Sequence, residues 1–188
     1  MAIAAERLTY EQYMAEGEIN KRYEILDGVR IFMTNPTIGH QQTQGNIYTS
    51  LRLWNQASQA GIVVQAPCDI LIRRSPLRTR QPDVLVVSND RFGERDLDDP
   101  APLDPAPESV VELLSPSETR RTLDDKLADY VRVGVQECWV VNRTTRTVEL
   151  LLLTQNSAES VVVYGVGETI QSIAFPGLTL AVADVFAR

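Results

Sequence analysis

The chain has 188 residues, of which 44% are hydrophobic and 23% are charged, as in an ordinary globular protein. It shows no apolar run near the roughly 20 residues of a membrane-spanning helix, and its N-terminus turns polar too early for a secretory signal, so we expect a cytoplasmic protein. The formal net charge of −7 argues against binding to nucleic acid through bulk electrostatics alone.

The predicted elements alternate along the whole chain. In chain order we expect a helix over 8–16, a β-hairpin over 22–33, a helix over 40–59, strands over 63–65 and 69–73, a strand opened by Asp83, a strand around Glu112, a helix over 122–133, strands over 137–141, 147–153 and 160–164, and a short helical stretch over 182–187. The turn signal Asp27-Gly28 indicates the hairpin, and Gly61 and Gly134 are expected to end the two long helices. This mixture predicts a single α/β or α+β domain over 1–188, built on a mixed sheet.

Oppositely charged segments flank the predicted strand at Asp83. Four arginines precede it in what we expect to be a loop: Arg73, Arg74, Arg78 and Arg80. The sequence DLDDPAPLDPAPE (96–108) follows it and carries much of the acid of the chain. The arginines either create a local positive potential near Asp83 or form a solvated loop, and the sequence favours neither.

Two acids stand in segments that are otherwise built for the core. Asp83 lies at the mouth of the strand in RQPDVLVV (80–87), and Glu112 lies amid the aliphatic residues of SVVELLSPS (109–117). A carboxylate that enters the core requires a partner. Asp83 could cap the strand or pair with Arg80, and Glu112 could pair with an arginine. The alternative is that both acids share a cation.

The helix over 122–134 supplies a third charged group. Its apolar stripe consists of Leu123, Leu127, Tyr130 and Val131, and the opposite side carries Asp125, Asp129 and Arg132. Lys126, one of two lysines in the chain, lies at the edge of the apolar stripe. It either extends to solvent, pairs with Asp129 at i+3, or meets a buried anion.

Two carboxylates and an inward lysine suit phosphodiester hydrolysis. Carboxylate oxygens bind Mg²⁺ and leave other coordination positions to water and phosphate. The ion lowers the pKa of bound water and neutralises charge on a phosphoryl oxygen. A lysine can orient the water or stabilise the transition state.

The motifs that carry these residues resemble those of a known family. They are RYEILDG (22–28), the GHQ around His40, QPDVLVVS (81–88), SVVELLSPS (109–117) and DDKLADYVRVGVQECWVV (124–141). In these stretches the chain resembles the Uma-type restriction endonuclease family of the PD-(D/E)XK nuclease superfamily. The resemblance implies a restriction-endonuclease-like mixed sheet flanked by helices, DNA as substrate and a homodimer.

The resemblance also implies roles for individual residues. Asp83 and Glu112 would bind Mg²⁺ or Mn²⁺, with the carbonyl of Leu113 as a third ligand. Glu24 would be an additional acid near the site, although a cross-strand pair with Arg30 explains it equally well. His40, the single histidine, has either a capping role or a role in the site.

One departure from the superfamily pattern concerns the lysine. The residue two positions after Glu112 is Leu114, and the Uma-type pattern places the lysine on the following helix, here at Lys126. The expected function is Mg²⁺-dependent hydrolysis of DNA by Asp83, Glu112 and Lys126, supported by Glu24. The alternatives are a DNA-binding or regulatory module that retains the fold without cleavage, and a hydrolase of RNA or another phosphodiester.

Overall fold

The computed structural model describes residues 7–16, 19, 21–115 and 119–188. The helices are α1 (Tyr10–Ala15), α2 (Ile38–Ser58), α3 (Asn89–Phe92), α4 (Arg120–Val133) and α5 (Val182–Val185). The strands are β1 (Tyr23–Leu26), β2 (Val29–Phe32), β3 (Gly61–Gln65), β4 (Ile70–Arg73), β5 (Arg78–Arg80), β6 (Val84–Ser88), β7 (Ser109–Leu113), β8 (Glu137–Asn142), β9 (Thr147–Leu153), β10 (Ala158–Tyr164), β11 (Thr169–Gln171) and β12 (Thr179–Ala181). The last two residues of the motif at 109–117 lie outside the described part of the chain.

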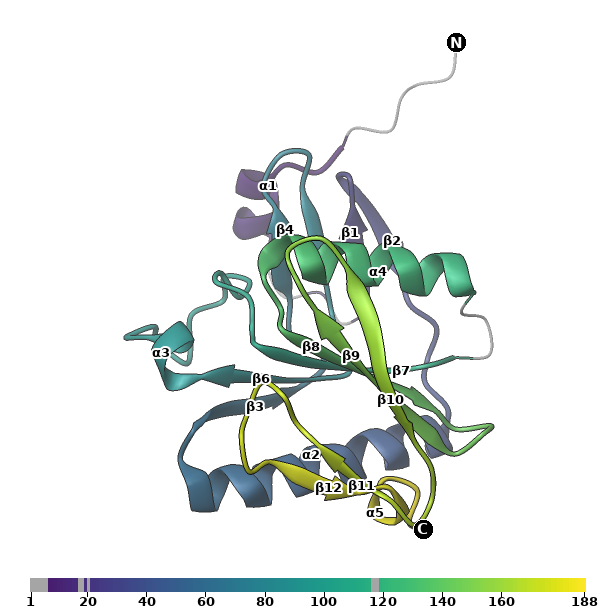
Figure 1. The fold of residues 1–188 in the computed structure, drawn as a ribbon. Helices are drawn as coiled ribbons and strands as arrows, with labels where there is room; N and C mark the ends of the chain where they lie inside the picture. Colours follow the sequence, from purple (N-terminus) through teal and green to yellow (C-terminus); the bar gives the residue numbers. More distant parts are fainter. Residues whose placement is uncertain (1–6, 17–18, 20, 116–118) are drawn as a thin grey trace.

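A large mixed sheet forms the centre of the molecule, with the strand order β10-β9-β8-β7-β6-β3. Its strands pair antiparallel except for β7 and β8, which run parallel because α4 forms the crossover between them. Figure 1 shows α2 and α4 on opposite sides of this sheet. The predicted mixed sheet flanked by helices is therefore confirmed.

Alternation along β6 and β7 divides the core into two layers. Val84 and Val111 pack in the cluster that contains Ile47 of α2. Leu85 and Val110 pack in the cluster that contains Leu123, Leu127 and Tyr130 of α4. Because side chains alternate along a strand, Glu112 shares the α4 side of the sheet with Val110, and this alternation brings it to α4.

A smaller sheet, with the order β2-β1-β5-β4, contains the predicted hairpin. Its strand β5 corrects the expectation of an arginine-rich loop, because Arg78 and Arg80 are strand residues that are almost fully buried. The correction extends to α4, where Asp129 is buried against these arginines although it lies opposite the apolar stripe. Ion pairs stabilise this strand, and a pattern of hydrophobic residues cannot reveal them.

The ends of the helices follow local capping. Thr9 and Gln12 form a capping box at the start of α1, and Gly134 ends α4 in the left-handed conformation with φ 79°, as predicted. Helix α2 begins earlier than predicted, at Ile38, because Thr37 caps it, and it ends at Ser58, with Gln59 rather than Gly61 as its left-handed cap. The short elements α3, β11 and β12 lie in segments where we predicted neither helix nor strand. Among the described residues, no helix has the length and apolar character needed to cross a membrane.

Candidate active site

Asp83 is fixed where the chain enters β6. Its backbone N–H donates to the carbonyl of Val111 at 3.0 Å, which ties the residue to β7. Its Oδ2 accepts a hydrogen bond of 2.8 Å from the N–H of Leu113, at the end of that strand. The backbone of β7 therefore holds the carboxylate close to Glu112.

The other oxygen of Asp83 faces nitrogen atoms of Arg22 and His40. Oδ1 lies 3.2 Å from Nη1 of Arg22 and 3.2 Å from Nε2 of His40. Burial opposes ionisation of Asp83, but the contacts with His40, the Leu113 N–H and Arg22 outweigh it and lower the pKa of this carboxyl. Asp83 thus pairs with Arg22 rather than with Arg80. The backbone N–H of His40 donates to the hydroxyl of the capping residue Thr37, and its ring contacts the carboxylate of Asp83.

Glu112 is buried on the α4 side of β7. Its Oε2 lies 2.7 Å from Nζ of Lys126, and its Oε1 accepts a hydrogen bond from the hydroxyl of Tyr130. Burial raises the pKa of Glu112 to about 7, with Lys126 lowering it and the neighbouring charges of Asp83 and Glu24 raising it. Lys126 therefore meets a buried anion rather than Asp129 or open solvent.

A pocket of about 480 Å³ opens on these groups. Asp83, Glu112, Leu113 and Lys126 all line it, although they come from three segments that are distant in the sequence. The structure thus brings together the two acids and the lysine that the sequence singled out. It places His40 at the same pocket.

The donor set fits a hard divalent cation held by few protein ligands. Among the described residues, no group of three or more His, Cys, Asp or Glu side chains could enclose a metal. Mg²⁺ does not require such a cage, since one or two carboxylates with water and substrate phosphate suffice. The charge of Asp83 raises the cost of ionising Glu112 at the same pocket, and a bound cation would offset that cost.

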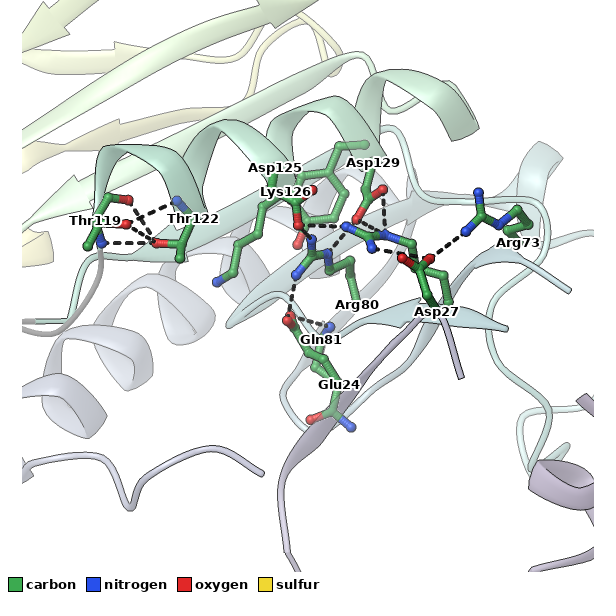
Figure 2. Close-up of polar contacts among 12 residues, drawn as sticks. Glu24, Asp27, Arg73, Arg80, Gln81, Thr119, Thr122, Asp125, Lys126 and Asp129 are labelled. Atoms are coloured by element: carbon green, nitrogen blue, oxygen red, sulfur yellow. Dashed lines mark hydrogen bonds and ion pairs between the residues drawn. The ribbon is translucent and has the colours of Figure 1, made fainter. Parts of the chain in front are cut away.

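Glu24 pairs with an arginine other than Arg30. Its cross-strand neighbour is Ile31 rather than Arg30, and its carboxylate accepts from Arg80 at 2.7 Å. Figure 2 shows Arg80 between Glu24 on one side and Asp125 and Asp129 of α4 on the other. Glu24 does not itself line the pocket, but its Oε1 accepts a hydrogen bond of 3.4 Å from the N–H of Gln81, which does, and its charge acts on Glu112.

Arginine, tyrosine and glutamine side chains complete the site and were not predicted as members of it. Arg22 binds Asp83, Tyr130 binds Glu112, and Nε2 of Gln44 donates to the backbone carbonyl of Asp83 at 2.8 Å. Helical spacing was the available signal for two of them. Tyr130 follows Lys126 by four residues, and Gln44 follows His40 by four, so each lies one turn from a site residue.

Comparison with solved structures finds a protein of the same fold. A crystal structure from Anabaena variabilis, described as "a putative nuclease belonging to DUF820", matches with a TM-score of 0.75 and 17% sequence identity. The match covers 95% of this chain and 97% of that chain, and at this identity it shows a shared fold. The Uma2 family, described as "Putative restriction endonuclease", matches residues 9–183. The chain belongs to the Uma2 family, as the resemblance predicted; no curated protein matches it.

Proposed function

We propose that this protein hydrolyses phosphodiester bonds in DNA and requires Mg²⁺. One observation carries the proposal. Asp83 and Glu112 face one pocket from adjacent strands, and the ammonium group of Lys126 lies 2.7 Å from Glu112. Membership of the Uma2 family supports a nuclease in particular, because its description names a restriction endonuclease.

Each residue has a distinct task in this proposal. Asp83, Glu112 and the Leu113 carbonyl would hold Mg²⁺, which when bound lowers the pKa of water and offsets charge on the phosphoryl oxygen. The Leu113 N–H fixes the orientation of Asp83, and Arg22 and His40 favour its ionised form. Lys126 favours the ionised form of Glu112 and can stabilise negative charge on the phosphate. Glu24 supports the site indirectly, by holding Arg80 against α4.

Cleavage assays test this proposal directly. Plasmid and single-stranded DNA are incubated with the purified protein, with and without Mg²⁺ or Mn²⁺. We expect metal-dependent cleavage that Glu112→Gln and Asp83→Asn abolish and that the exposed control Glu159→Gln retains. If wild type and Glu112→Gln are equally inert while DNA is still bound, the protein is a binding module. Cleavage restricted to RNA or a small phosphodiester would instead support the alternative hypothesis, a hydrolase whose substrate is not DNA.

We also propose a homodimer, and the exposed edge strand β10 of the large sheet supports it. Of the two apolar strands, β9 contributes to the core and β10 exposes apolar side chains. Val148 and Leu150 of β9 are buried in the core, whereas Val161 and Val163 of the edge strand β10 are 52% and 53% exposed. An exposed apolar edge strand is suited to pairing with a second copy.

A further inference from the structure

The lining of the candidate active-site pocket includes two walls of different chemistry. One wall is apolar and consists of Ile31 and Phe32, at the end of the edge strand β2. The other wall is polar and includes Thr37, at the start of α2, and Arg143, which follows β8. The roles assigned to Asp83, Glu112 and Lys126 require neither wall.

The apolar wall presents an aromatic ring that is held in place and still exposed. Phe32 is 54% exposed, yet its ring packs edge-on against Tyr23 with the centroids 5.9 Å apart. Nζ of Lys21 lies 5.8 Å from the centroid of the same ring. Ile31 beside it is 46% exposed. A supported aromatic face next to cations is the arrangement on which unstacked bases bind.

The polar wall presents a cation whose charge no carboxylate offsets. Nη1 of Arg143 lies 3.4 Å from the hydroxyl oxygen of Thr37, and among the described residues no carboxylate lies within ion-pair distance of Arg143. Its guanidinium occupies the space beside Gly39, where a Cβ would lie 1.9 Å from Nη2. The absence of a side chain at Gly39 therefore makes room for the guanidinium at the rim of the pocket. A guanidinium placed in this way suits a phosphate oxygen.

We propose that these walls form a subsite for one unpaired nucleotide, with its base on Phe32 and its phosphate at Arg143. The substrate class is then single-stranded or locally unpaired nucleic acid rather than an intact duplex. In a duplex the base faces are stacked on one another, so they are not available to an aromatic wall. The net charge of −7 also fits poorly with tracking the dense phosphates of a duplex. This inference rests on the proposed nuclease function and narrows it.

Binding measured without cleavage tests the subsite. Fluorescence anisotropy in EDTA compares a labelled single-stranded DNA, its duplex and the RNA of the same sequence. We expect wild type to bind the single strand about tenfold more tightly than the duplex, and Phe32→Leu to lose about tenfold in affinity for the single strand. Phe32→Trp should retain the affinity, as should Leu53→Ala, which alters a 62% exposed apolar residue of α2 outside the pocket. If either single strand, the DNA or the RNA, binds more tightly than the duplex, the result supports the subsite. The single strand with the higher affinity identifies the natural substrate.

The salt dependence of binding separates the two walls. Arg143→Gln should reduce the slope of log K against log salt concentration by about 0.7, the value for one phosphate of a single strand, whereas Phe32→Leu should leave the slope unchanged. Thermal melting of each variant, together with the Phe32→Trp rescue, excludes loss of folding as the cause. Equal affinity for duplex and single strand, or full affinity of Phe32→Leu, would overturn the subsite. If the binding pattern holds and no cleavage occurs, hydrolysis fails and the subsite stands.

Discussion

The ammonium nitrogen of Lys126 lies 2.7 Å from Oε2 of Glu112, although the two residues belong to different elements. The strand position that carries the lysine in the superfamily pattern holds Leu114, which packs against the apolar layer beneath α4. The crossover helix thus delivers the charge that the strand lacks.

Replacing Lys126 should impair cleavage more than binding. Lys126→Met removes the cation beside Glu112, and we expect the rate of DNA cleavage to fall by about 100-fold, the usual cost of losing one group that stabilises a transition state. Single-turnover rates under saturating Mg²⁺ give the measurement. Arg121→Met removes one positive charge from an exposed position of the same helix and serves as the control. Equal rates for the two variants would exclude Lys126 from the reaction.

Glu112 should make the metal-free protein less stable as the pH rises. Burial raises its pKa in the folded protein to about 7, above the ordinary 4.5, so between these values the folded state binds more protons than the unfolded state. The free energy of unfolding therefore falls through this window, by on the order of 3 kcal/mol. Urea denaturation in EDTA from about pH 5 to about pH 8 gives the measurement.

Glu112→Gln removes this titration and is the matched comparison. The difference in stability between wild type and variant should change with pH in that window alone. Asp83 acts in another window, because its pKa is lowered and the stability it contributes is lost only as the pH falls below the ordinary range of an aspartate. Parallel curves for wild type and Glu112→Gln would contradict the raised pKa.

Arg80 should be the arginine on which stability depends most. Although burial opposes its charged form, the carboxylates of Glu24 and Asp129 raise its pKa above the ordinary value. Arg80→Met leaves both acids buried without this partner and should lower the free energy of unfolding by about 3–5 kcal/mol. Arg74→Met, which breaks a surface pair with Asp104, should cost no more than about 1 kcal/mol. Chemical denaturation of both variants decides the matter.

If the protein is a dimer through β10, a substitution in that strand should halve its mass in solution. Val163→Lys places a charge in the exposed apolar row of β10 and should convert a dimer to a monomer without altering the melting temperature at low concentration. Light scattering coupled to gel filtration measures the mass. A wild-type protein that stays monomeric at every concentration would refute the dimer and leave the single-stranded substrate class unaffected.

The sequence predicted those parts of the fold and site that repeat a local pattern. An apolar run predicted β9 and helical periodicity predicted α4, and the helical stripe placed Lys126 at its edge. Strand β5 was not predicted, because Arg78 and Arg80 are not apolar residues. Their burial is favourable only because of ion pairs with acids that are distant in the chain. The contact of Arg22 with Asp83 spans 61 residues, so no local spacing could indicate it.

The placement of the lysine on a crossover helix has a consequence for how such proteins are detected. A search template that demands an acid, one intervening residue and a lysine rejects this chain at Leu114, although an ammonium group lies 2.7 Å from Oε2 of Glu112. Templates written in three dimensions, with an ammonium donor near the second carboxylate regardless of chain position, would retain it.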